Sequence, residues 1–140
     1  MNYIDYTGKL NTHEEYVAIL DKLKSITSYI EIVIIDEKEN NEITNNFSKD
    51  IIEKKKVSKW WGTETEDINN LYKIKSSNEL FKFLKKYETF CKYIIKESKV
   101  DQQINTDFGY DDIAFYDENN KLLLYTTTHE CFITIIEDLI

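Results

Sequence analysis

The segment from residue 112 to residue 128 constrains the fold most, because it predicts two strands that pair antiparallel. Ile113 and Phe115 occupy alternate positions in one apolar stretch, and residues 122–126 form a second. Between them, residues 117–120 have the sequence Asp-Glu-Asn-Asn, which supplies the side chains that turns favour. A strand, a turn and a returning strand predict a β-hairpin in the C-terminal half of the chain.

A capping box predicts a helix near the N-terminus. Thr12 is followed three residues later by Glu15, a spacing at which each side chain can bond the other residue's backbone amide. Apolar residues then recur at helical spacing, and they are Tyr16, Ile19, Leu20 and Leu23. The next segment, residues 29–35, is a β-branched run interrupted only by Glu31, which predicts a strand covered on most of both faces.

A second capping pattern, formed by Ser76 and Glu79, predicts another helix. The apolar stripe behind it extends over residues 80–95, so we expect one helix over residues 77–97. Two phenylalanines lie off this stripe and leave open a helix that ends near Tyr87 and continues as a strand.

The middle of the chain has a less regular pattern. Residues 37–46 are polar and predict a loop or a frayed helix. We then expect a strand that ends at Trp60 and Trp61, a turn at Gly62 and a second strand near residues 71–75. Three acids lie in the intervening segment, where we expect a loop, and they are Glu64, Glu66 and Asp67.

The C-terminal segment fits two structures. Thr127 with Glu130 resembles a capping box, and apolar residues that follow fit a helical stripe. Residues 132–136 nevertheless have strong β propensity. We expect a terminal helix there.

Together these elements predict a single α+β domain over residues 1–140, in which an antiparallel sheet packs against two or three helices. A domain of 140 residues buries roughly 68–70% of its unfolded surface, enough for a core. The longest apolar runs have four residues, whereas a membrane-spanning helix needs about 20, so we expect no membrane partner. The N-terminus has no pattern of a secretory signal, so we expect a cytoplasmic protein.

Composition and charge exclude one class of partner. The chain has 20 Ile, 18 Lys and 12 Asn but no Arg and no Pro, which indicates a low-GC genome such as that of a Gram-positive bacterium or its phage. Its net charge is −8, and nucleic-acid binding requires positive charge to neutralise phosphates. We therefore expect no nucleic acid as a partner and favour a basic protein.

The two cysteines predict free thiols in a reducing compartment, because two cysteines do not make a disulfide framework. A metal site formed by Cys131, His129 and His13 is an alternative that lacks the usual spacing of zinc ligands. We expect no metal and no cofactor.

Few residues could carry out catalysis. The three glycines belong to no phosphate-binding loop, and no Gly-x-Ser-x-Gly motif is present. A small hydrolase or nuclease could use His129 as a base with Asp111, Asp112 or Glu130. We instead expect that His129 bonds locally at a strand end, that Glu130 caps the following element and that the aspartates lie in solvent. The sequence thus predicts no catalytic residue.

The adjacent Trp60 and Trp61 are candidate binding residues. Neighbouring strand residues point to opposite faces, so at least one indole should be partly exposed. Tryptophan is enriched in binding hot spots, and the nearby Glu64, Glu66 and Asp67 would suit a basic partner. The acids of the C-terminal hairpin form a second candidate surface, and they are Asp111, Asp112 and Asp117.

The segment from Asp107 to Asp117 and the residues from Leu122 to Phe132 resemble stretches of small bacterial immunity proteins. The shared features are an acidic entry, a hairpin with Asp at its turn and a Thr-His-Glu ending, over roughly 25 residues. The resemblance implies a single-domain cytoplasmic protein that binds and blocks a cognate toxin domain, often a basic nuclease, and it implies no catalytic residues.

The sequence therefore predicts a protein-binding module, acting as a monomer or weak dimer, that neutralises a basic bacterial toxin. A phage-encoded inhibitor of a host defence protein would have the same features. The small hydrolase described above is the enzymatic alternative.

Overall fold

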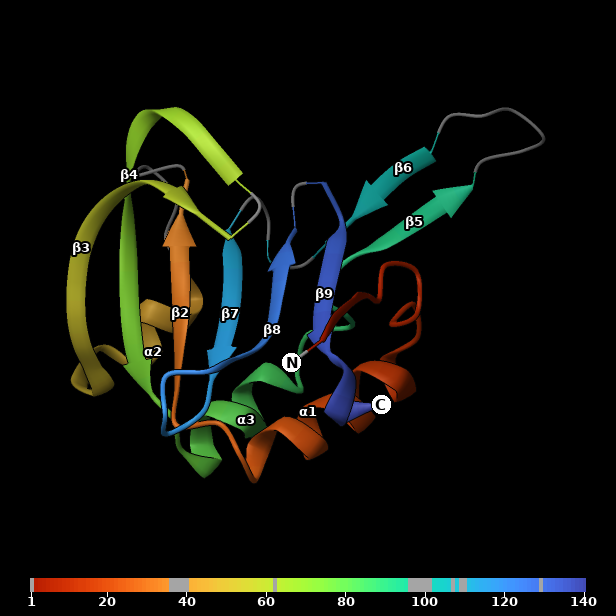
Figure 1. Cartoon of the computed structure of the whole chain (residues 1–140), viewed down its shortest axis with the longest axis horizontal. Coiled ribbons are helices and arrows are strands. Elements are labelled where there is room, and N and C mark those ends of the chain that lie inside the picture. Colours follow the sequence, from red (N-terminus) through yellow and green to blue (C-terminus); the bar gives the residue numbers. More distant parts are fainter. Residues whose placement is uncertain are drawn as a thin grey trace.

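The computed structural model describes residues 2–35, 41–61, 63–95, 102–106, 108, 111–128 and 130–140, with the backbone alone for residues 93–95 and 102–105. It confirms the predicted fold class. In the described part of the chain, seven strands form one antiparallel sheet in the order β1-β9-β8-β7-β2-β4-β3 (Figure 1). A separate two-stranded sheet, β5 with β6, projects from one side.

The elements have the following bounds. The strands of the large sheet are β1 (Tyr3–Asp5), β2 (Tyr29–Ile34), β3 (Ile51–Trp60), β4 (Thr63–Lys75), β7 (Asp112–Tyr116), β8 (Leu122–Thr127) and β9 (Phe132–Ile136). The small sheet contains β5 (Lys92–Ile95) and β6 (Gln102–Asn105). The helices are α1 (His13–Lys24), α2 (Glu42–Asn46) and α3 (Asn78–Leu84), with 3-10 turns η1 (Ser48–Asp50) and η2 (Glu137–Leu139).

The main core lies between the sheet and the helices. Side chains of β2 alternate, so that Ile30, Ile32 and Ile34 point to the helices while the intervening residues point to the opposite face. The helices contribute residues such as Tyr16 and Leu84, both fully buried. The Tyr16 hydroxyl donates to the Leu84 carbonyl oxygen at 2.5 Å, which joins α1 to α3.

The predictions for the first helix and for the C-terminal hairpin are confirmed. Thr12 accepts a hydrogen bond from the Glu15 backbone amide at 3.1 Å, and the Glu15 carboxylate accepts one from the Thr12 amide. Strands β7 and β8 pair as expected, and β2 is buried on most of both faces. The polar segment after residue 40 contains the short helix α2, while residues 36–40 lie outside the described part.

The prediction of a single helix over residues 77–97 is wrong. Helix α3 ends at Leu84 and the chain continues into β5, which agrees with the alternative that the stripe left open. The cap residue is Ser77 rather than Ser76, since the Ser77 hydroxyl accepts from the Leu80 amide at 3.1 Å. The apolar residues beyond the helix are buried in the core by contacts with other elements. Phe90, for example, packs against Tyr16 of α1.

The terminal helix is also wrong, because residues 132–136 form strand β9. This strand pairs with β8 on one side and β1 on the other, so its β-branched residues bond to two neighbours. Thr127 and Glu130 form a turn before the strand, in which Cys131 has a left-handed φ of 57°. The acidic segment Glu64–Asp67 was expected to be a loop and is part of β4.

The prediction of two free thiols is wrong. Cys91 and Cys131 form a disulfide, with their Cα atoms 5.5 Å apart. Forty positions separate them in the sequence, so spacing gave no indication of the pairing. No helix in the described residues is long and apolar enough to cross a membrane.

Candidate binding face

The sheet face opposite the helices carries a second cluster of aromatic side chains. Tyr29 of β2 and Tyr116 of β7 stack with their ring centroids 4.9 Å apart. Ala114 and Leu122 complete the buried cluster, and the half-buried Tyr125 of β8 packs against it. These residues lie here because strand residues two apart share a face of the sheet.

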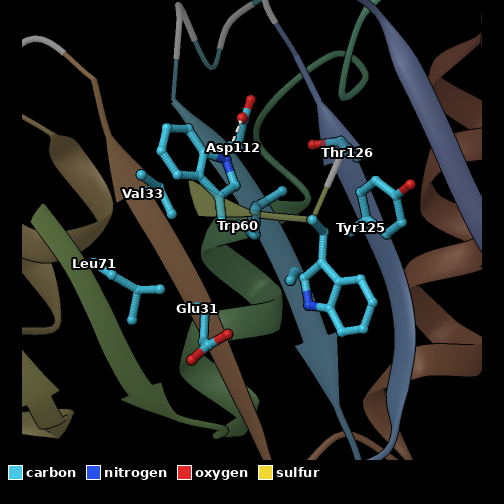
Figure 2. A pocket seen from close by; sticks show the side chains of 10 residues that line it. Glu31, Val33, Trp60, Leu71, Asp112, Tyr125 and Thr126 are labelled. Atoms are coloured by element: carbon cyan, nitrogen blue, oxygen red, sulfur yellow. Dashed lines mark hydrogen bonds between the residues drawn. The ribbon is translucent and has the colours of Figure 1, made fainter. Parts of the chain in front are cut away.

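The β3–β4 hairpin brings two tryptophans to this face, because its tip bends toward β7 (Figure 1). Trp60, the last residue of β3, donates its indole N–H to the Asp112 carboxylate at 2.8 Å (Figure 2). Trp61 donates its indole N–H to the Tyr116 hydroxyl and stacks on Tyr125 at 5.9 Å between centroids. Both indoles are therefore anchored to the C-terminal hairpin.

The two tryptophans differ in exposure but share a face. Trp61 is 46% exposed and Trp60 is half-buried, which confirms that at least one indole is partly exposed. The expected reason was wrong, since the two side chains do not lie on opposite faces of a strand. Trp61 follows the end of β3 in a turn, so strand alternation does not apply to it and both indoles line one pocket.

We name this pocket the indole pocket. It is a narrow pocket of about 20 Å³ between the hairpin tip and the sheet, which is room for about one water molecule. It is lined by Glu31, Val33, Trp60, Trp61, Leu71, Asp112, Ile113, Ala114, Tyr125 and Thr126. An adjoining groove shares Glu31, Trp60, Trp61 and Leu71 with it and adds Lys55, Val57 and Lys59. Figure 2 shows Glu31 extending from β2 beside this pocket.

Carboxylates influence the titration of both stacked tyrosines. Burial and the Glu31 carboxylate raise the pKa of Tyr116, while the hydrogen bond from Trp61 lowers it by a smaller amount. Burial also raises the pKa of Tyr29, with contributions from Glu31, Asp117 and Glu53. Both tyrosines are therefore neutral at physiological pH, and Glu31 is near enough to Tyr116 to raise its pKa.

Lysines surround this face at its outer side. Lys73 of β4 lies opposite Glu31 in the β2–β4 register, but its ammonium sits over the Tyr29 ring, 4.0 Å from the centroid. Lys55 and Lys59 of β3 are exposed at the edge of the sheet. Lysine on an edge strand also discourages pairing with other chains, which accounts for part of this pattern.

Asp111 and Asp112 do not lie in solvent, contrary to expectation, and they are 5% and 4% exposed. The Asp111 carboxylate accepts from the Ile35 amide at 3.3 Å and the Asn41 side chain at 2.7 Å. Asp112 accepts from the Thr128 amide at 2.9 Å in addition to Trp60. Both carboxylates hold donors inside the protein, so we do not expect either to contact a partner directly, although Asp112 lines the indole pocket.

The other predicted site residues remain accessible. Asp117 is half-buried and holds the β7–β8 turn, since its carboxylate accepts from the amides of Asn119 at 2.8 Å and Lys121 at 2.9 Å. Three acids are exposed on the first part of β4, and they are Glu64, Glu66 and Asp67. Glu64 lies opposite Lys59, the residue before Trp60, so this end of the acidic segment lies close in the hairpin to the tryptophans.

The residues of the enzymatic alternative are not assembled into a described site. The proposed base, His129, lies outside the described residues. Glu130 is exposed, and the two buried aspartates hold backbone and side-chain donors as given above. Within the described residues, no three His, Cys, Asp or Glu side chains are grouped to hold a metal ion.

Sequence reasoning missed Glu31 and the tyrosines of this face as site residues. The available signal was Glu31 itself, a charge that interrupts an otherwise apolar strand. No family model matches the chain, and neither a curated protein nor a solved structure matches it at a significant level.

Proposed function

We propose that this chain is a protein-binding module that neutralises a basic bacterial toxin domain by covering its active or substrate-binding face. The observation that carries the proposal is Trp61, an indole that is 46% exposed although it is held in place by Tyr116 and Tyr125. A large ring that is already ordered loses little entropy on binding, which is the property of a hot-spot residue.

The charges near Trp61 support a basic partner. Glu64, Glu66 and Asp67 are exposed on β4 of the hairpin that carries both tryptophans, and the chain has a net charge of −8. Complementary charge steers association and selects partners. The resemblance of residues 107–132 to small immunity proteins agrees with this class of partner. We propose the cytoplasm as the compartment and a monomer or weak dimer as the free form.

The experiment begins with the gene next to the one for this chain. The product of that gene is purified, and its binding to this chain and the inhibition of its activity are measured by calorimetry and by an activity assay. Trp61→Ala should weaken binding by about 2 kcal/mol or more. Ile26→Ala is the control, since Ile26 is also exposed, at 42%, but lies outside the indole pocket. A neighbouring product that this chain neither binds nor inhibits would contradict the proposed function.

The enzymatic alternative has its own test. His129→Ala should leave the biological activity intact if the chain acts by binding. Loss of a catalytic base would lower a reaction rate by about 10²–10⁴-fold. Such a loss in a variant with an unchanged circular dichroism spectrum would favour the hydrolase.

A further inference from the structure

We infer that the groove adjoining the indole pocket, which has a volume of about 460 Å³, receives a cationic side chain, arginine or lysine, from the protein partner, with Glu31 as its counter-charge. This inference rests on the proposed function and assigns the partner's contact chemistry. The groove combines a half-buried carboxylate, Glu31, with the two indoles of Trp60 and Trp61, and this combination recognises an organic cation.

The first step concerns the position of Glu31. It is the one charged residue of β2, and its neighbours on that strand are buried. A charge among apolar side chains is unfavourable unless it has partners. Lys73, which faces Glu31 across the ladder, directs its ammonium over the Tyr29 ring instead, and Glu31 is near enough to Tyr116 to raise the pKa of its hydroxyl. Glu31 therefore borders both the indole pocket and the adjoining groove.

The second step concerns the two indoles. Each N–H is already used within the protein, by Asp112 for Trp60 and by Tyr116 for Trp61. A ligand therefore meets the ring faces, which carry the negative part of the aromatic quadrupole. A guanidinium or ammonium held over such a face, with a carboxylate beside it, gains from both interactions.

The third step concerns the sign of the charge. Lys55 and Lys59 also line the adjoining groove and would favour an anion. Both are exposed on an edge strand, where solvent and salt screen them, whereas Glu31 is half-buried in the middle of the sheet. Burial is the largest cause of the raised pKa values of Tyr29 and Tyr116, and the Glu31 charge adds to both in the same direction.

The experiment uses the full chain and a matched pair of probes. N-acetyl-arginine amide is compared with N-acetyl-citrulline amide, which has the same shape but no charge. The chain has two tryptophans, so two indole N–H signals in nitrogen-15 NMR spectra report on the groove. The arginine probe should shift both signals and saturate at millimolar concentration, with citrulline binding at least about tenfold more weakly.

Variants test the assignment of Glu31. Glu31→Gln keeps the size of the side chain and should weaken arginine binding about tenfold. Lys55→Ala should strengthen arginine binding, because it removes a repelling charge at the groove. Circular dichroism confirms that each variant is folded. If Glu31→Gln does not fold, the sign of the Lys55→Ala effect decides the test.

Three results would overturn the inference that this groove binds a cationic side chain. They are no saturable shift up to about 50 mM arginine probe, equal binding of the citrulline probe, or weaker arginine binding by Lys55→Ala. The proposed function is judged separately, by the neighbouring gene product. If the groove does not bind arginine but Trp61 still contributes to toxin binding, only the inference about the groove is wrong. If the groove binds arginine but the chain binds no neighbouring gene product, only the proposed function is wrong.

Discussion

Trp60 and Trp61 are adjacent and identical in chemistry, yet their surroundings give them different roles. The Trp60 indole N–H bonds to Asp112, a buried carboxylate that also holds the Thr128 amide. Trp61 bonds to the Tyr116 hydroxyl and leaves nearly half of its surface in solvent. Trp60 therefore connects the hairpin tip to the sheet, and Trp61 offers a surface to a partner.

Phenylalanine substitutions separate these two roles. Trp60→Phe removes one donor from the buried Asp112 carboxylate and should lower the free energy of unfolding by about 1–3 kcal/mol. Trp61→Phe removes a donor from a site near solvent and should cost less than about 1 kcal/mol. Urea denaturation followed by circular dichroism measures both values. Equal losses, or a larger loss in Trp61→Phe, would contradict this division.

Tyr116 gives the fold a pH dependence on the alkaline side. Burial and Glu31 raise its pKa above the ordinary value of 10.0, so the folded protein holds the phenolic proton more tightly than the unfolded chain does. The stability from this group is complete below about pH 10 and is lost as the pH rises above it. Tyr116→Phe, which lacks the hydroxyl, should show a shallower loss.

The measurement is the free energy of unfolding in urea at several values between about pH 8 and pH 11. The variant is less stable at neutral pH because it also loses the hydrogen bond from Trp61, so the slopes are compared rather than the absolute values. Tyr29 contributes in the same direction in both proteins. Parallel curves for the two proteins would show that Tyr116 has no such role.

At the scale of elements, the sequence predicts those whose signal is local. The Thr12–Glu15 capping box and the β7–β8 hairpin are each specified by residues within a few positions of one another. Helix α3 begins one residue later than predicted, since Ser77 rather than Ser76 caps it, and its end depends on tertiary contacts. Phe90 lies beyond that end and packs against Tyr16 and Phe115, both distant in sequence.

Strand β9 is also decided by contacts with segments distant in sequence. Its sequence fits a helical stripe and a β-branched strand equally, and local signals do not choose between them. The choice is made by β8 and β1, which bond to its two edges. A single sequence does not show such pairing, because β1 lies more than a hundred residues away.

The disulfide links two segments that the sequence predicts as helix and that fold as strands. Cys91 lies just before β5 and Cys131 just before β9. A cross-link between residues forty positions apart restricts the unfolded chain, so Cys91→Ala with Cys131→Ala should lower the free energy of unfolding by about 3–4 kcal/mol. Urea denaturation without reductant measures the loss. Adding dithiothreitol to the wild-type chain should reproduce most of it, whereas the double variant should not respond.

Thiol titration of the unfolded, unreduced protein gives the second measurement. No free thiol is expected, and two free thiols would contradict the disulfide. The result also bears on the proposed compartment, because cytoplasmic reductants normally keep cysteines reduced. Both cysteine side chains are nearly fully buried, at 1% and 2% exposed, which shields the bond in the folded state.

At the scale of the whole molecule, the binding face depends on contacts between distant segments. Glu31, Trp61 and Tyr116 come from β2, the β3–β4 turn and β7, and the sheet order brings them together. The sequence indicated the tryptophan pair and the nearby acids, because adjacent residues are visible in any sequence. It did not indicate the stacked tyrosines Tyr29 and Tyr116, which the register of β2 with β7 places side by side.

Charge is distributed unevenly over the molecule, and this determines how association should respond to salt. The net charge is −8, while exposed lysines gather on β3 and exposed acids on the first part of β4. If those acids steer the chain toward a basic toxin domain, the association rate should fall about tenfold or more as the screening length decreases to about 8 Å at physiological salt.

Stopped-flow measurement of the indole fluorescence gives this rate with the purified toxin domain. A triple variant, Glu64→Gln, Glu66→Gln and Asp67→Asn, should associate more slowly at low salt and depend less on salt, because all three acids are exposed. Its dissociation rate should change little, since the steering charges surround the indole contact without being part of it. Association that is independent of salt in both proteins would exclude electrostatic steering and leave Trp61 and the indole pocket as the source of the affinity.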